Sequence, residues 1–254
     1  MITLRNLSTG YGRHTVMRGI NAELRQGELV SLLGPNGVGK STLLRTLSAF
    51  LPPLAGDIRI GDRPLNQLST RERSRLIGVV LTERTSVQHM TVRNMVGMGR
   101  TPYTGFWGGL NDEDRRVVDD AMQQTGIVHL QHRYINTLSD GERQKVMIAK
   151  AVAQETPIIL LDEPTAFLDY PSKVEMMRML LRLAHGMQKT IFLSTHDVEM
   201  ALQLSDRVWL MEEGRIIAGT PRQLAQDGHI AHFVCREGVQ FDAQSLTIQL
   251  QVNA

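Results

Sequence analysis

The chain has 254 residues, 42% of them hydrophobic and 21% charged, which allows a sizeable buried core and excludes a fibrous or disordered protein. Its 28 basic and 26 acidic residues leave a formal net charge of +2, and this small excess does not indicate the concentrated basic face of a nucleic-acid-binding protein. Cys235 is the only cysteine and no run approaches the roughly 18 apolar residues of a spanning helix, so we expect a cytoplasmic protein without disulfides.

Apolar and β-branched runs predict strands at residues 2–7, 16–24, 28–33, 57–60, 76–81, 158–161 and 190–194. Helical patterns cover residues 40–50 and 171–187 and most of 91–127, and short strands around a short helix follow Gly214. The strands at 2–7, 16–24 and 57–60 look antiparallel, whereas the others alternate with helices as in a parallel sheet. We therefore predict an α/β fold with a mostly parallel sheet covered by helices, an antiparallel β subdomain and a helical insert.

A complete phosphate-binding pattern, Gly-x-x-x-x-Gly-Lys-Ser/Thr, lies between the strand at 28–33 and the helix at 40–50. Its residues are Gly34, Pro35, Asn36, Gly37, Val38, Gly39, Lys40, Ser41 and Thr42. Glycines let backbone N–H groups approach a phosphate closely, and the following helix offers its free N–H groups and positive dipole end. Lys40 is expected to reach the β- and γ-phosphates and Ser41 to ligate Mg²⁺, so the sequence predicts a P-loop for ATP and Mg²⁺.

Two carboxylates, Asp162 and Glu163, follow the apolar strand at 158–161. Ligands of open α/β sheets bind at this end of the strands. We expect Asp162 to hold Mg²⁺ and Glu163 to act as general base on the attacking water. A solvated acidic turn before Pro164 is the alternative, and the complete P-loop favours the catalytic interpretation.

With the stretch Leu138-Ser139-Asp140-Gly141-Glu142, these motifs make the chain resemble the ATP-binding subunit of ABC transporters. The resemblance covers nearly the whole chain, although Asp140 and Glu142 depart from the commonest form of this signature motif. It implies one domain over 1–254 of the ABC ATPase type. A P-loop NTPase core and antiparallel strands would occupy about 1–90 and 155–220, a helical subdomain about 91–154, and a C-terminal extension about 221–254.

The resemblance also implies roles for residues outside the P-loop. His196 matches the switch histidine, Tyr11 the aromatic residue that stacks on adenine, and Leu168-Asp169 the D-loop. In the family, two ATPase subunits pack head to tail, so Ser139, Gly141 and Glu142 would contact the nucleotide held by a second copy. Simpler interpretations coexist: Ser139 with Glu142 is also a helix capping box, and Asp169 before Pro171 is also a helix N-cap.

One position departs from the family. A glutamine that touches Mg²⁺ usually follows the strand at 76–81, but this chain has Thr82 and then Glu83. Either side chain could ligate Mg²⁺ through oxygen. We therefore expect an altered metal contact at this position.

The insert stretch Gly97 to Tyr103, followed by Phe106 to Leu110, resembles importers of metal chelates such as ferric siderophores, haem or cobalamin. The implied protein is an importer ATPase held at the cytoplasmic face of the inner membrane by two permease subunits, and served indirectly by an extracytoplasmic substrate-binding protein. A soluble ABC-type ATPase, for instance in iron–sulfur cluster assembly, is the alternative. An ATP sensor without turnover is a third hypothesis, suggested only by Thr82.

Overall fold

The computed structural model describes residues 1–81, 89–105, 108–212, 214–236 and 238–250. Its strands are β1 (Ile2–Tyr11), β2 (His14–Leu24), β3 (Leu29–Leu33), β4 (Ala55–Ile60), β5 (Arg63–Pro64), β6 (Ile77–Val80), β7 (Ile158–Leu161), β8 (Thr190–Ser194), β9 (Arg207–Glu212), β10 (Arg215–Gly219), β11 (Val239–Asp242) and β12 (Thr247–Leu250). Its α-helices are α1 (Lys40–Leu47), α2 (Thr70–Leu76), α3 (Val92–Gly97), α4 (Asp112–Gln124), α5 (Asp140–Ala153), α6 (Tyr170–Met187), α7 (Val198–Leu204), α8 (Pro221–Gln226) and α9 (His229–Val234).

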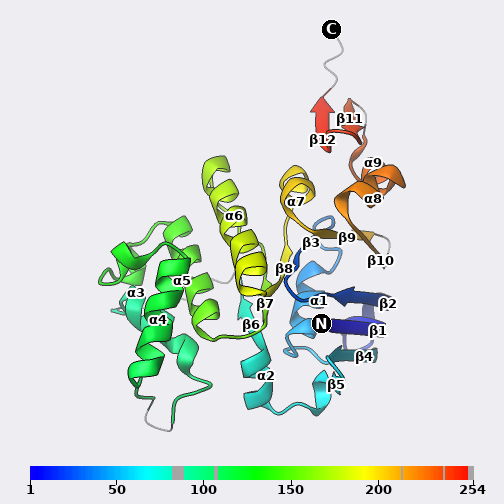
Figure 1. The fold of residues 1–254 in the computed structure, drawn as a ribbon. Helices are drawn as coiled ribbons and strands as arrows, with labels where there is room; N and C mark the ends of the chain where they lie inside the picture. Colours follow the sequence, from blue (N-terminus) through cyan, green and yellow to red (C-terminus); the bar gives the residue numbers. More distant parts are fainter. Residues whose placement is uncertain (82–88, 106–107, 213, 237, 251–254) are drawn as a thin grey trace.

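The strands form a six-stranded sheet in the order β10-β9-β3-β8-β7-β6 and a four-stranded sheet in the order β2-β1-β4-β5 (Figure 1). In the first sheet β9, β3, β8, β7 and β6 are parallel, and β10 pairs antiparallel with β9. The second sheet is antiparallel throughout. The α/β fold with an antiparallel subdomain is therefore confirmed.

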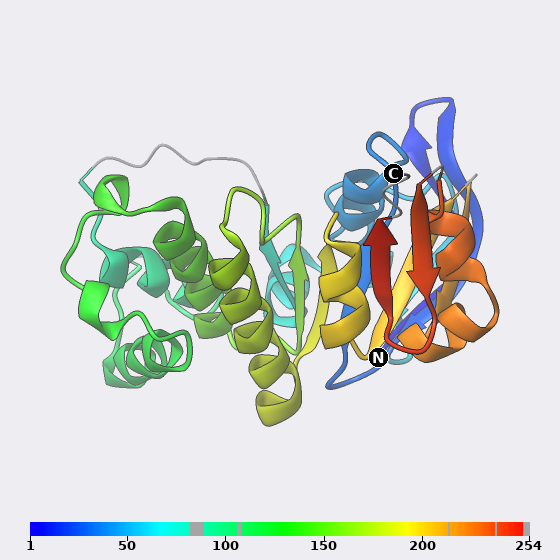
Figure 2. The same ribbon diagram turned by 90° about the horizontal axis from the view of Figure 1, so that it is seen from above.

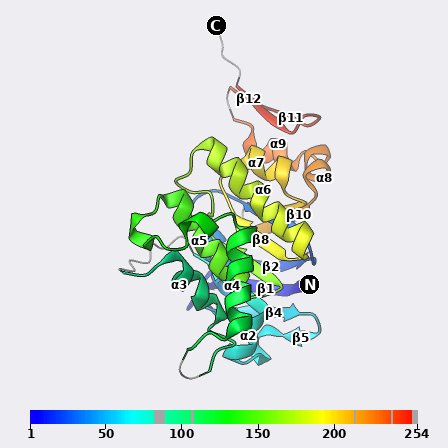
Figure 3. The same ribbon diagram turned by 60° about the vertical axis from the view of Figure 1, so that its left-hand side comes forward.

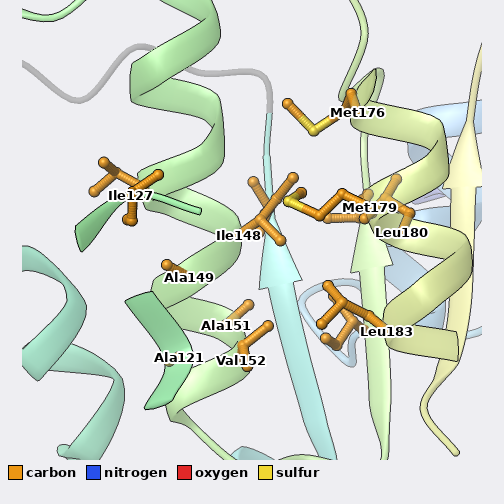
Figure 4. Close-up of a cluster of buried hydrophobic side chains, with 14 of the residues drawn as sticks. Ala121, Ile127, Ile148, Ala149, Ala151, Val152, Met176, Met179, Leu180 and Leu183 are labelled. Carbon is orange, nitrogen blue, oxygen red and sulfur yellow. The ribbon is translucent and has the colours of Figure 1, made fainter. Parts of the chain in front are cut away.

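Both faces of the parallel sheet are buried, as the alternation along β7 shows. Ile158 and Leu160 join an apolar cluster with α1 and the antiparallel sheet, whereas Ile159 and Leu161 face the cluster around α5 and α6. Figure 4 shows side chains of α5, such as Ile148, meeting those of α6 in this second cluster. Met176, Met177 and Met179 of α6 belong to this core, since each is at most 2% exposed.

The helical subdomain of α3, α4 and α5 lies beyond β6, at the end of the molecule opposite the antiparallel sheet (Figures 1 and 2). The C-terminal elements from α8 to β12 form a separate layer over α7, away from α3–α5 (Figure 3). This tail is tied to α7 because the Ile248 N–H donates to Glu199 Oε1 at 2.7 Å. Among the described residues, no helix combines the length and apolar character needed to cross a membrane.

The topology brings three loops to one edge of the sheet. The P-loop follows β3, Asp162 and Glu163 follow β7, and the loop that contains His196 follows β8, which lies between β3 and β7. Parallel strands end at the same edge, so motifs far apart in sequence lie side by side there.

Candidate active site

The shape of the P-loop is set by steric contact as well as by backbone freedom. Gly37 and Gly39 have φ values of 77° and 110°, in the left-handed region that favours glycine. A Cβ atom on Gly39 would lie 2.2 Å from Cγ1 of Val16 on β2, a distance no side chain could tolerate. Val16 of the antiparallel sheet therefore packs directly against the residue before the first turn of α1.

Lys40 is 6% exposed and its ammonium group is held inside the loop. Nζ donates to the carbonyl oxygens of Gly34 at 2.8 Å and Pro35 at 3.0 Å. Burial lowers the pKa of Lys40, and the nearby charges of Glu163 and Asp162 oppose that shift. In the described residues no side chain caps the N-terminus of α1 and its first turn has no acidic residue, so the arrangement fits a polyphosphate anion.

Asp162 and Ser41 converge from neighbouring loops. The Ser41 hydroxyl donates to Asp162 Oδ1 at 3.4 Å, and the Ser194 hydroxyl donates to the same oxygen at 2.7 Å. A hydroxyl and a carboxylate are the hard oxygen ligands that Mg²⁺ prefers, so these two side chains fit that ion. No sequence motif points to Ser194. The available sequence signal is that this polar residue ends an otherwise apolar strand, and in the structure it is fully buried.

Glu163 and His196 make the most direct contact in the site. Nε2 of His196 donates to Oε1 of Glu163 at 2.5 Å. The Glu163 backbone has φ 48°, in the left-handed region, and its N–H donates to Ser194 Oγ at 2.9 Å. Ser194 thus connects the carboxylate of Asp162 with the backbone of Glu163. Glu163 is 30% and His196 43% exposed, so water can reach both side chains.

Tyr11 ends β1 beside α1 and is 46% exposed. Arg45 Nη1 donates to Tyr11 Oη at 3.4 Å, and this bond is the main cause of the lowered pKa of Tyr11, followed by one from Thr42. The aromatic ring therefore lies near the phosphate loop with an open surface, as an adenine-stacking residue requires.

The signature residues lie apart from the P-loop. Ser139 and Glu142 form the expected capping box of α5: the Glu142 carboxylate accepts from the Ser139 N–H at 2.8 Å, and Ser139 Oγ accepts from the Glu142 N–H. The bond from the Ser139 backbone is the largest cause of the lowered pKa of Glu142. β6 and β7 separate α5 from α1 (Figures 1 and 2), so a single chain does not bring Ser139 or Gly141 to its own P-loop.

Among the remaining predicted positions, the structure describes Asp169 but not the two departures from the family or the two aromatic residues of the insert. The Asp169 side chain accepts from the Ser172 N–H at 2.9 Å, which confirms the helix N-cap. Thr82, Glu83, Phe106 and Trp107 lie outside the described residues, so the structure does not place them.

Residues 17–166, more than half of the chain, match the family model described as ABC transporter. The chain belongs to the ABC transporter ATP-binding family. The import ATPases of this family bind and hydrolyse ATP, and the resemblance expected from the motifs is confirmed.

Two curated relatives of this ABC ATPase cover most of its length. The ferric enterobactin transport ATP-binding protein FepC of Escherichia coli is 36% identical over 219 residues, which are 86% of this chain and 81% of the relative. The iron(3+)-hydroxamate import ATP-binding protein FhuC of Bacillus subtilis is 32% identical over 247 residues, which are 97% of this chain and 90% of the relative.

Solved structures match this ABC ATPase as well. A transporter described as being of the metal-chelate type, in an inward-facing conformation, matches with TM-score 0.77 and 28% identity, over 88% of this chain and 84% of that chain. A dimeric ATP-binding cassette in a post-hydrolysis state with ADP and Pi matches with TM-score 0.74 and 27% identity, over 87% of this chain and 99% of that chain.

Proposed function

We propose that this chain is the ATP-hydrolysing subunit of an importer for a metal chelate, such as a ferric siderophore, haem or cobalamin. The observation that carries the proposal is the 2.5 Å contact of Glu163 with His196, at the same sheet edge as the P-loop and its buried Lys40. The similarity to FepC, of ferric enterobactin transport, and to FhuC, of iron(3+)-hydroxamate import, supports the chemical class of the cargo.

The roles of the side chains follow from their positions. Lys40 and the free N–H groups of α1 bind and orient the phosphates. Ser41 and Asp162 would hold Mg²⁺, which when bound neutralises charge on the phosphate oxygens. Glu163 orients the attacking water and accepts its proton as the water oxygen bonds to the γ-phosphorus and the bond to ADP breaks. His196 holds the Glu163 carboxylate, and Tyr11 stacks on the adenine.

The complete site requires a second copy of the chain. Ser139 and Gly141 lie at the N-terminal end of α5, whose free amides suit a phosphate, yet α5 and α1 are on opposite sides of β6 and β7. A head-to-tail dimer would bring the signature of one copy, with Glu142 as its cap, to the P-loop of the other. The similar dimeric cassette supports this arrangement.

The partners of this dimer are two permease subunits that hold it at the cytoplasmic face of the inner membrane. An extracytoplasmic binding protein would deliver the chelate to them. Closure of the dimer on ATP and its opening after hydrolysis would shift the permeases between two states, because the contacts in trans exist only in the closed state.

Co-expression with the neighbouring membrane genes tests the proposal. The reconstituted complex should hydrolyse ATP faster when the binding protein carries a ferric chelate than when it is empty. The Glu163→Gln variant should bind ATP, remain in an ATP-bound dimer and lose about 100-fold or more in turnover. Purification without any membrane partner, together with chelate-independent turnover, would favour the soluble ATPase. Parent-like turnover of Glu163→Gln would contradict the assignment of Glu163.

A further inference from the structure

A cavity of about 130 Å³ adjoins the Glu163–His196 pair, and both residues line it. Close packing therefore does not hold these partly exposed side chains on that side. Their 2.5 Å contact depends instead on polar groups that fix the two loops carrying them.

Asp197, the residue after His196, makes polar contacts with the turn after Glu163 and with α6. Its Oδ2 accepts from the hydroxyl of Thr165, two residues after Glu163, at 3.3 Å. Its Oδ1 accepts from Nζ of Lys173, in the first turns of α6, at 3.0 Å. Thr165, Lys173 and Asp197, here called the bracket, all line the same cavity. One carboxylate thus joins the turn after Glu163, the loop of His196 and the start of α6.

The stability of α6 does not explain the position of Lys173. It is the fourth residue of a helix whose N-terminus carries partial positive charge, where a cation is unfavourable. The lysine side chain is also 75% removed from solvent, being 25% exposed. The Asp197 carboxylate lies on a different element and carries the opposite charge. It therefore offsets both the unfavourable helix dipole and the partial burial of the Lys173 ammonium group.

We propose that the bracket holds His196 against Glu163 during ATP hydrolysis, and that Lys173 and Asp197 are positioning residues that do not touch ATP. The inference rests on the proposed function, because it assumes that Glu163 and His196 act in hydrolysis. Through Lys173 the bracket also reaches the first turns of α6, the helix that Asp169 caps.

The Lys173→Met variant tests the proposal in the complex of the chain with its permeases. It keeps the unbranched apolar part of the side chain and removes the charged group that contacts Asp197. We expect kcat for ATP hydrolysis to fall roughly 10- to 100-fold, the range expected when a catalytic group is misplaced by about 1 Å. The KM for ATP should stay within about twofold because the P-loop is unchanged.

A matched control is a second lysine–carboxylate pair that also involves α6. Lys145 Nζ lies 2.8 Å from Glu175 Oε1, and the pair joins α5 to α6 with a similarly exposed lysine side chain, 22%, without contacting Glu163 or His196. Lys145→Met should keep the parent kcat. Lys173→Arg, which retains the charge, should recover most of the turnover that Lys173→Met loses.

A double-mutant cycle separates positioning from simple stability. If the bracket acts as one unit, Lys173→Met combined with Asp197→Asn should lose no more turnover than the worse single variant. Binding of a fluorescent ATP analogue checks that each variant is folded. If Lys173→Met fails this check, Lys173→Arg and Thr165→Val take its place, with Thr165→Val expected to lower kcat at constant KM.

Two outcomes overturn the inference in distinguishable ways. If Lys173→Met turns over like Lys145→Met while Glu163→Gln is inactive, the bracket is wrong and the proposed function stands. If Glu163→Gln turns over like the parent, the catalytic assignment fails and the bracket fails with it.

Discussion

The two glycines of the phosphate loop with positive φ, Gly37 and Gly39, differ in the space around them. Gly37 and Gly39 both have positive φ, yet a Cβ atom on Gly37 would meet nothing within 4 Å, whereas one on Gly39 would meet Val16 Cγ1 at 2.2 Å. A side chain would therefore meet backbone strain at both positions, and a steric clash with the antiparallel sheet only at position 39.

We predict that Gly39→Ala weakens ATP binding much more than Gly37→Ala does. Left-handed backbone costs a non-glycine residue about 1–2 kcal/mol at either position, and the clash should displace the start of α1 in addition. Equilibrium titration with a fluorescent ATP analogue measures the difference. Adding Val16→Ala to Gly39→Ala should recover part of the affinity. Equal losses at the two glycines would show that the contact with β2 is unimportant.

Residues of the site differ in how far the sequence predicts them. Lys40 and Ser41 belong to a contiguous motif, so local spacing is enough to identify them. His196 could be assigned only through the family resemblance, because it is 33 residues from the Glu163 it contacts. Ser194 and Asp197 could not be assigned from spacing, since their partners lie on other strands and helices and are brought near by the sheet order.

Elements with uniform burial are predicted best. β7 and β8 match the predicted 158–161 and 190–194 because both faces of a central parallel strand are apolar. The helix predicted to reach residue 50 ends at Leu47, which corrects the prediction. Ala49 takes φ 60° and the Phe50 N–H bonds back to the Arg45 carbonyl at 2.9 Å. The usual signal for such a C-terminus is glycine, which is absent here.

The stretch from Gly97 to Tyr103, interpreted from sequence as a marker of metal-chelate importers, has a structural role as well. Arg100 is 4% exposed; its Nε donates to Asp114 Oδ1 at 2.9 Å and its Nη1 to the Ala153 carbonyl at 2.9 Å. Its guanidinium also lies 4.1 Å from the centre of the Tyr103 ring. This arginine thus joins the start of α4 to the end of α5.

We predict that Arg100→Met destabilises the protein by about 3–5 kcal/mol, because it leaves the buried Asp114 carboxylate without its cation. Arg93→Met is the matched control, since the Arg93–Asp119 pair also ties α4 to a neighbouring helix, α3, but is 35% and 52% exposed. It should change stability by about 0–1 kcal/mol. Urea unfolding measures both values, and equal losses would contradict a special role for the buried pair.

The whole molecule holds the two halves of the predicted ATP site apart. The P-loop, Asp162, Glu163 and His196 share one edge of the sheet, whereas Ser139 and Gly141 begin a helix beyond β6. The order of the strands in the sheet determines how far α5 lies from the P-loop. No local sequence pattern reveals this order, because most strands that are neighbours in the sheet are far apart in the chain. The proposed head-to-tail dimer would bring the two halves together, and this proposal makes a quantitative prediction.

Two inactive variants should restore activity when mixed. Lys40→Ala removes the phosphate-binding lysine and Ser139→Arg blocks the signature, so each homodimer has two damaged sites. In a mixed dimer, one site combines both lesions and the other combines an intact P-loop with an intact signature. Random mixing at equal amounts gives mixed dimers in about half of cases, so ATPase activity should reach roughly a quarter of the parent value.

The control is a mixture of Lys40→Ala with the parent chain, whose mixed dimers also have one intact site. Parent homodimers alone give about a quarter of the parent activity in this mixture, so activity near one half shows that one intact site can turn over while the other is damaged. If it can, and the two inactive variants still give no activity together, then Ser139 does not act across the interface and each chain carries its own complete site. Recovery in both mixtures requires that the signature of one copy serves the P-loop of the other.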